Sequence, residues 1–325
     1  MANLHLTQNE RYQIYALRKA GHSIRTMAEH LGRSPSTISR ELRRNRGRRG
    51  YRPAKAHEIA CRRALRSRRQ VRIDASQWQL VETLLRLHWS PEQIAHRTRL
   101  EGTLSISHEW IYRYIRADRA RGGRLWKHLR QAHRRRRRYG TRGARRPKIR
   151  ARIGIEHRPA HVENREELGH WEGDTIIGHG QKGAAVTLVE RTSRYTRIGR
   201  LSQRDARQTA TVIGHRLQQL SARVHTLTLD NGTEFALHGR AARALSAEIY
   251  FADPYAPWQR GSNENTNGLI RQYLPKRRRL DDLTESEATR IEKRLNHRPR
   301  KCLGFRTPHE VFNGTLTTIT VALRS

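Results

Sequence analysis

The chain has 325 residues, with 67 Lys and Arg against 29 Asp and Glu, which gives a formal net charge of +38. This length allows two or three domains, while an apolar content of only 35% places part of the chain in linkers or on solvated surface. Because so much positive charge repels itself in a compact state, we expect a polyanionic partner. Charge alone does not separate nucleic-acid binding from binding to a membrane surface.

Other classes of protein are excluded by simple patterns. No apolar run is long enough to span a bilayer, and the start MANLHLTQNE lacks the order of a signal peptide. Cys61 and Cys302 are isolated in sequence and suit a reducing compartment, so we expect a cytoplasmic protein associated with the nucleoid. None of the 18 histidines belongs to a pair matched by a CxxC or similar partner, and the sequence therefore predicts no zinc site.

Residues 1–46 have the pattern of a helix-turn-helix domain. Ser23 can cap a second helix, and Ser34–Pro35 is the expected start of a third. On this third helix Ile38 and Leu42 point inward, which turns a Ser/Thr/Arg face outward, and in such domains that face enters the major groove. An ordinary three-helix bundle with a basic face is the alternative. The expected DNA contacts are Arg33, Ser36, Thr37, Arg40 and Arg44.

Three further segments follow before the C-terminal half. Residues 47–73 form a basic connector, with one helix expected after Pro53. Residues 74–117 resemble a second helix-turn-helix domain with a longer turn, and its last helix would present His108, Tyr112 and Arg113 to DNA. Residues 118–160 form a basic linker, and residues 116–152 hold 17 Lys and Arg. We expect Arg135 and Arg137 in this linker to follow DNA phosphates.

Residues 161–325 change in character. Strand patterns lie over HWEGDTIIG and twice within AAVTLVERTSRYTRIGRL, followed by a helix over DARQTATVIGHRLQQL. A strand at VHTLTLDNG, a helix near FALHGRAARALSA, a strand at EIYFAD and a helix opened by GSNENTNG come next, and TESEATRIEKRLNHRP adds a last helix. The order predicts an α/β layer arrangement whose first three strands form an antiparallel meander.

Three acidic residues lie within or at the ends of these predicted strands and helices, where they could form a metal site. Asp174 lies in the first strand, Asp230 ends the fourth, and Glu264 lies in the first turn of the helix after the fifth, following Ser262 as its expected cap. If they meet at one sheet edge, each pair at ~5 Å repels by roughly 3 kcal/mol at an effective dielectric of about 20. Such a cluster stays ionised only with cations between its members, and oxygen ligands suit Mg²⁺ or Mn²⁺. Two such ions support phosphodiester displacement.

The residues alone leave alternatives open at each position. Asp230 precedes Asn–Gly and can be a turn residue, while Glu264 can be an ordinary helix-start residue. Glu172 competes with Asp174, because residues at i and i+2 point to the same face of a strand.

Several longer motifs resemble one known family. GHWEGD, LTLDNGTEF, FADPYAPWQRGSNENTNGLIRQYLP and LNHRPRKCLGFRTPHEVF are similar to bacterial insertion-sequence transposases of the IS30 family. The resemblance spans nearly the whole chain and implies an α/β RNase H-like, integrase-type catalytic core in residues 161–325, preceded by all-α helix-turn-helix domains. It places the catalytic, metal-binding triad on Asp174, Asp230 and Glu264, and makes Glu172 a neighbour. It also implies binding to terminal inverted repeats, cleavage there and joining to target DNA.

The resulting hypothesis is a Mg²⁺- or Mn²⁺-dependent DNA transposase with a two-metal site. It would act on double-stranded DNA as a homodimer or larger homo-oligomer, with no membrane partner. Trp258, Arg260 and Asn267 flank the proposed site and are further expected DNA contacts. A sequence-specific regulator with an inert C-terminal half and a nuclease that cuts without joining are the rival hypotheses.

Overall fold

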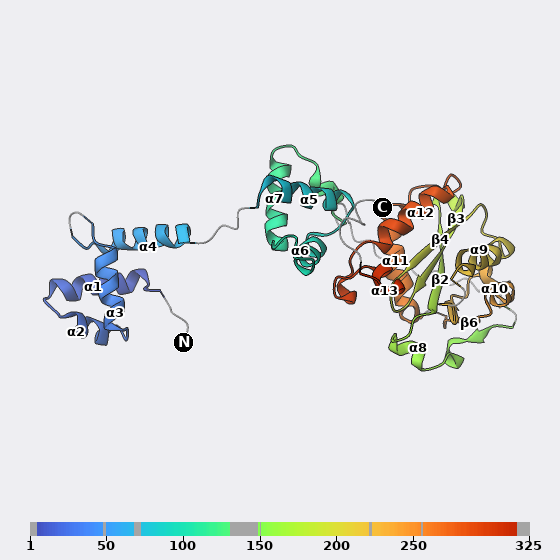
Figure 1. Ribbon diagram of the computed structural model, residues 1–325, viewed down its shortest axis with the longest axis horizontal. Coiled ribbons are helices and arrows are strands. Elements are labelled where there is room, and N and C mark those ends of the chain that lie inside the picture. The colour runs from blue at the N-terminus through green and yellow to red at the C-terminus, as the bar shows by residue number, and fades with distance from the viewer. Residues whose placement is uncertain are drawn as a thin grey trace. The chain divides into compact units, whose positions relative to one another are not determined.

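The computed structural model describes residues 5–47, 50–67, 73–130, 149, 151–220, 223–254 and 256–316. The chain splits into two compact units, residues 1–73 and 74–325. In Figure 1 the first unit is blue and the second runs from teal to red. None of the helices in these described ranges has the length and apolar character that crossing a bilayer requires. Arg135 and Arg137, two of the expected DNA contacts, lie outside the described residues.

The first unit is a small helical domain. Its core contains Ile14, Met27 and Ile38, and also Tyr51 and Ala56, which the sequence analysis assigns to the connector. The N-cap predicted at the second helix is confirmed, because the side chain of the residue before it accepts from a backbone N–H three residues later. The helices are α1 (Gln8–Lys19), α2 (Ile24–His30), α3 (Pro35–Arg44) and α4 (Pro53–Ser67).

An ion pair fastens α1 to the turn before α3. The carboxylate of Glu10 accepts from the backbone of Thr7 in a capping box, and Arg33 Nε donates to it at 2.7 Å. Arg33, an expected DNA contact, therefore also has a partner within the domain. The hydrogen bond from Arg33 and those from Thr7 lower the pKa of Glu10 from 4.5 to about 2.

Replacing Glu10 by Gln is expected to destabilise this unit by roughly 1–3 kcal/mol at pH 7, because a charge-assisted bond is lost. The pKa of Glu10 is lower in the folded state, so its stabilisation is complete above pH 4.5 and is lost as the pH falls toward 2. The measurement is amide hydrogen exchange of α1, corrected for intrinsic rates. The difference in amide protection between wild type and variant should shrink as the pH falls from 4.5 toward 2. Glu29→Gln, at an exposed position of α2, is the control, and a pH-independent difference for Glu10→Gln would contradict the assignment.

The second unit begins with three helices. They are α5 (Ala75–Arg86), α6 (Pro91–Leu100) and α7 (His108–Ala120), and the longer turn predicted between the last two is confirmed. On α7 the side chains of Ile111 and Ile115 are buried, while His108, Tyr112 and Arg113 are exposed as predicted.

A six-stranded mixed sheet organises the rest of this unit. Its strands, in the order β1-β6-β5-β2-β3-β4, are β1 (Ile153–Gly154), β2 (His170–Ile177), β3 (Ala184–Glu190), β4 (Thr196–Leu201), β5 (Thr226–Leu229) and β6 (Glu248–Phe251). Strands β2, β3 and β4 pair antiparallel, whereas β5 joins β2 and β6 in parallel. The predicted antiparallel meander is confirmed, and β1 is an addition that the sequence analysis places in the linker.

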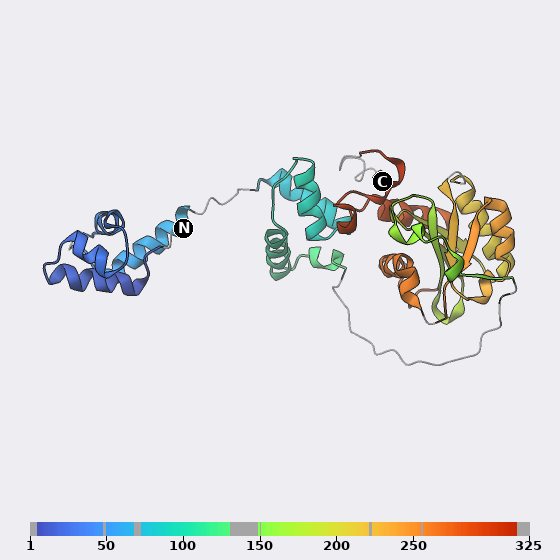
Figure 2. The ribbon, with the colours of Figure 1, turned by 90° about the horizontal axis from the view of Figure 1, so that it is seen from below.

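Helices cover both faces of this sheet (Figures 1 and 2). On one face α9 (Ala206–Gln218) and α10 (His238–Leu245) pack Ile213 and Leu245 against the strands. On the other face α11 (Gly261–Ile270) and α12 (Glu285–Asn296) contribute Ile270 and Ile291 to a second core. The short helix α8 (His161–Asn164) precedes β2, and α13 (Pro308–Asn313) follows α12. The sheet with its two helical layers is an RNase H-like α/β fold.

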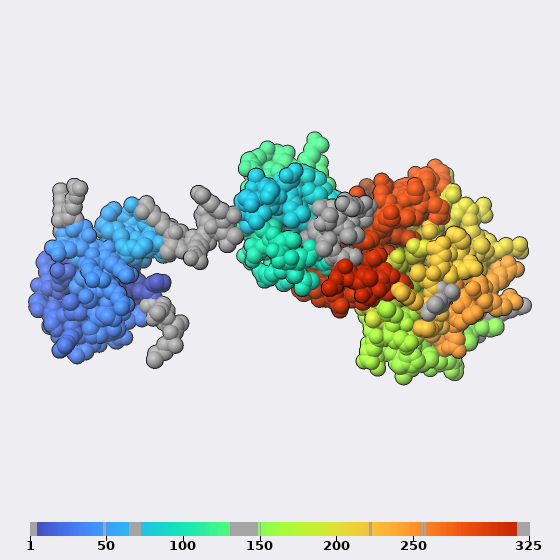
Figure 3. Space-filling view, in the orientation of Figure 1, coloured from blue at the N-terminus to red at the C-terminus, as the bar shows by residue number. Residues whose placement is uncertain are grey.

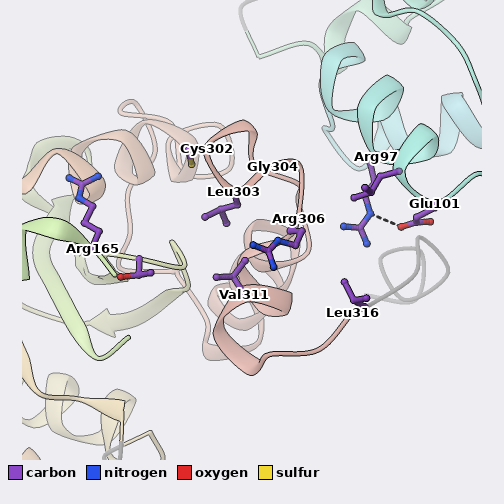
Figure 4. Close-up of a pocket in the computed structure, with 11 residues that line it drawn as sticks. Arg97, Glu101, Arg165, Cys302, Leu303, Gly304, Arg306, Val311 and Leu316 are labelled. Atoms are coloured by element: carbon purple, nitrogen blue, oxygen red, sulfur yellow. Dashed lines mark hydrogen bonds and ion pairs between the residues drawn. The ribbon is translucent and has the colours of Figure 1, made fainter. Parts of the chain in front are cut away.

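The helix α13 joins this α/β part to the α5–α7 helices. Its Phe312 stacks on Tyr195 with ring centroids 4.4 Å apart, and its Glu310 accepts two hydrogen bonds from Arg97 of α6. Figure 3 shows the C-terminal segment in red against the teal helices. An open pocket of about 910 Å³ lies beside this contact, and Figure 4 shows Arg97 and Glu101 facing it from α6. Glu101 is the one acid among the described residues that line this pocket, and it pairs with Arg97.

Candidate active site

The parallel pairing of β2 with β5 places two of the predicted acids, Asp174 and Asp230, at neighbouring positions on adjacent strands. His170 pairs with Thr226 and Glu172 with Thr228, an offset of 56 residues, which is also the separation of Asp174 and Asp230. Asp174 lies within β2, and Asp230 is the first residue after β5. Because alternate residues of a strand share a face, both carboxylates point to the side of the sheet that carries α11.

A guanidinium group lies between these two carboxylates. Arg260 Nη1 is 3.7 Å from Asp174 Oδ1, and its Nη2 is 3.6 Å from Asp230 Oδ2. The aspartate side chains keep 25% and 26% of their surface exposed, so solvent reaches both. Burial raises the pKa of the Asp174 carboxyl to about 6, Arg260 opposes that shift, and the nearby charge of Asp230 adds to it. The structure thus brings Asp174, Asp230 and Arg260 together.

Helix α11 carries the third predicted acid. Asn267 Nδ2 donates to Asp174 Oδ2 at 2.8 Å, and Arg260 lies just before the helix starts. Positions 260, 264 and 267 are spaced by four and three residues, so Glu264 belongs to the face that its two neighbours turn toward the aspartates. Glu264 is exposed, and among the described residues its carboxylate does not form a group with both aspartates within 4.8 Å of one another.

The start of α11 is held differently from the prediction. The expected cap at Ser262 is wrong, because the helix begins at Gly261 and continues from the 3₁₀ turn Pro257–Arg260, so Ser262 lies inside it. Glu172 supplies the acceptor instead, since its Oε2 receives the backbone N–H of Asn263 at 2.9 Å. Glu172 is fully buried and also pairs with Arg191 at 3.3 Å, so its carboxylate is already engaged.

The Asn263 side chain fixes the helix over the strands. Its Nδ2 donates to the backbone oxygens of Glu172 and Thr187, and its Oδ1 accepts from the Thr187 hydroxyl at 3.1 Å. Asn263 itself is fully buried. These bonds set the position of Glu264, which is the next residue.

Sequence reasoning missed a second buried carboxylate beside the site. Glu234 accepts from the hydroxyl of Thr175 at 2.6 Å and from Arg204 at 2.7 Å. Its charge adds to the raised pKa of Asp174, so Glu234 lies close to the acidic edge. In the motif DNGTEF, Glu234 is the fourth residue after Asp230. The sequence does not indicate that its carboxylate is buried beside the acidic edge, and only the fold shows this.

The remaining expected DNA contacts are spread over both units. Ser36, Arg40 and Arg44 are exposed on α3, and Thr37 is partly buried. Trp258 exposes 74% of its surface just before α11.

The chain is similar to several known proteins. Residues 3–45 match the family described as a helix-turn-helix domain. The chain is 40% identical over 323 residues to the transposase for insertion sequence element IS4351 of Bacteroides fragilis, covering 99% of each chain. It is 43% identical over 321 residues to transposase InsI for insertion sequence element IS30A of Escherichia coli strain K12, covering 94% of this chain and 83% of the relative. The solved catalytic core domain of BIV integrase matches 45% of this chain and 95% of its own, with 23% identity and a TM-score of 0.35.

A helix-turn-helix domain ahead of an α/β domain, in a chain whose full-length relatives are transposases, defines a DNA-acting protein of the transposase class. With identities of 40% and 43% to curated relatives over most of its length, the chain belongs to the IS30 family of insertion-sequence transposases.

Proposed function

We propose that this transposase cuts DNA at the terminal inverted repeats of an insertion sequence and joins the freed ends to target DNA, with Asp174, Asp230 and Glu264 as its catalytic site. The observation that carries the proposal is the level placement of Asp174 and Asp230 across β2 and β5, under the face of α11 that bears Glu264. Water and then a DNA 3′-hydroxyl would be the successive nucleophiles, with no covalent link between protein and DNA.

The three acids offer the oxygen donors that a divalent cation prefers, and their carboxylates would have to draw closer together than in this structure to share one. Their oxygens suit Mg²⁺ or Mn²⁺, and the guanidinium of Arg260 between the two aspartates marks a place where positive charge is favourable. When bound, a pair of such ions activates an attacking oxygen and stabilises a leaving oxygen in phosphodiester displacement. Asp174, Asp230 and Glu264 would hold the ions.

Neighbouring side chains have supporting roles in this proposal. Asn267 orients the Asp174 carboxylate through its hydrogen bond of 2.8 Å. Arg260 neutralises the two aspartates in the absence of substrate, and on DNA binding its guanidinium turns to the phosphate beside the cleaved bond. Glu172 and Asn263 hold the first turn of α11. In this proposal they support Glu264 as it reaches toward the aspartates.

The basic surfaces would select and hold the DNA. In this proposal α3 reads the inverted repeat, α7 contacts a second site, and the linker residues Arg135 and Arg137 bind the backbone. Each phosphate neutralised steepens the salt dependence of binding by roughly 0.9 log units per log unit of salt. Two transposon ends are handled together, so the working form is a homodimer or larger, acting on DNA in the cytoplasm.

The test uses the full-length protein and a labelled duplex carrying one of the inverted repeats that flank its coding sequence. With Mg²⁺ present, the protein is expected to nick the duplex at the repeat boundary and to join the labelled strand to a target plasmid. Replacing Mg²⁺ with a chelator should leave DNA binding and abolish both products. Cleavage without joining would favour a nuclease, and specific binding without either product would favour a regulator.

A further inference from the structure

A cluster of histidines surrounds one glutamate at the opposite end of β2 from the acidic edge. The imidazole Nε2 atoms of His170, His161 and His225 lie 3.5, 3.8 and 3.8 Å from the carboxylate of Glu167. His161 belongs to α8, His170 opens β2, and His225 immediately precedes β5. One ligand atom each from His161, Glu167 and His170 lies within 4.8 Å of the other two.

His170 has a ring nitrogen without a hydrogen-bond partner. The residue is only 3% exposed, and its Nδ1 lies 2.9 Å from the hydroxyl of Thr226. Its buried Nε2 has no hydrogen-bond partner among the described residues, because the 3.5 Å approach of Glu167 lacks hydrogen-bond geometry. A histidine whose Nδ1–H is held by an oxygen while its Nε2 stays open has the arrangement of a metal ligand.

The backbone at Gly169 leaves room for a fourth side chain, that of His225. Gly169 has φ of +109°, and a Cβ on it would meet the His225 ring at 2.2 Å. The backbone N–H of His225 also donates to the Gly169 carbonyl at 2.8 Å, which fixes the start of β5 beside this glycine. Glycine at this position therefore allows His225 to approach the cluster.

We propose that this chain binds one zinc ion through His161, Glu167 and His170, with His225 as the fourth ligand. Three imidazole nitrogens and a carboxylate are a suitable ligand set for tetrahedral zinc, with bonds of about 2.0–2.2 Å. The separations of 3.5–3.8 Å around Glu167 are close to those that such bonds require. The ring centroid of His225 is 5.8 Å from that of His170, so the half-exposed His225 side chain must rotate toward the other three ligands to complete the site. The ion ties the segment before β2 to the start of β5.

The site is independent of the proposed active site. Its ligands lie in α8, in the residues up to the start of β2 and just before β5, whereas Asp230 follows the last residue of β5. The sequence analysis predicts no zinc site because it looked for histidine pairs matched by a CxxC or similar partner. Here three ligands without a cysteine lie within residues 161–170, and the fourth, His225, joins them only in the fold.

The test measures zinc binding to metal-free full-length protein. Zinc chloride is titrated in competition with a chromophoric chelator, in excess Mg²⁺ so that the carboxylates near Asp174 are occupied. We expect the His161→Ala and Glu167→Gln variants to lose one equivalent of zinc, or to bind it at least roughly tenfold more weakly. His161 and Glu167 side chains are 60% and 57% exposed, so these variants retain their fold, unlike a change at buried His170.

Two controls make the result specific. His157→Ala, at a histidine that is 70% exposed and four residues before His161, is expected to bind zinc like the wild type. Zinc X-ray absorption should show nitrogen and oxygen ligands without sulfur, which separates this site from Cys61 and His57, whose Sγ and Nε2 lie 3.5 Å apart on α4. Unchanged zinc affinity in both ligand variants, or a sulfur ligand at the tightest site, would overturn the proposal.

Discussion

The Glu264→Gln variant is expected to bind an inverted-repeat duplex with wild-type affinity and to lose both strand cleavage and strand joining. The substitution keeps the size and hydrogen-bonding capacity of the side chain but removes the negative charge that a divalent ion requires. Removing one group that stabilises transition-state charge costs roughly 10²–10³-fold in rate, and we expect a loss at least this large. Both steps should fail together, because one site serves both.

The measurement compares product formation with binding on the same labelled duplex. Glu285→Gln is the matched control, since Glu285 is also an exposed glutamate in the first turn of a helix of this domain. It should retain cleavage and joining. A fully active Glu264→Gln variant would show that α11 contributes no acid to the reaction and would refute the assignment of the triad.

The Glu310→Gln variant is expected to lower the free energy of unfolding by about 3 kcal/mol or more. The side chains of Arg97 and Glu310 are only 4% and 1% exposed, and the carboxylate accepts from both terminal nitrogens of the guanidinium. Removing one partner leaves a buried charge, and such changes typically cost roughly 3–5 kcal/mol. Glu101 also contacts Arg97 and offsets part of that cost.

Glutamine is chosen because Glu310 also completes the capping box of α13 with Thr307, a role that glutamine can keep. Urea unfolding followed by tryptophan fluorescence reports on this region, since Trp89 is buried among the α5–α7 helices. Lys301→Ala is the control, because Lys301 pairs with Glu92 between the same parts of the unit but is 74% exposed. It should change stability by at most about 1 kcal/mol. Equal effects of the two variants would contradict the role given to the buried pair.

Local patterns predicted most of the secondary structure. The N-cap at Ser23, the helix start at Pro35, the helix over 206–218 and the antiparallel meander are all found where the sequence indicated them. These features depend on residues close in the chain, which is why capping and alternation can reveal them. The cap at Ser262 failed for the same reason, because the real acceptor is Glu172, 91 residues away in β2.

The candidate site was predicted only in part. Spacing and family resemblance selected Asp174, Asp230 and Glu264, but Arg260 between the aspartates and the buried Glu234 beside them were not foreseen as parts of the acidic edge. Both depend on which side chains face the same space once β2, β5 and α11 are packed. Nothing in the order of residues along one element carries that information.

The sequence by itself determined the DNA-binding character of this protein, its helix and strand order, and the three acids on which catalysis is proposed. Only the tertiary structure decided that Asp174 and Asp230 are level, because this follows from the parallel register of β2 and β5. It also decided that Arg97 and Glu310 form a buried pair and that three histidines meet at Glu167. Local order arises from neighbouring residues, whereas these groups come together only when hydrophobic burial packs distant segments against one another.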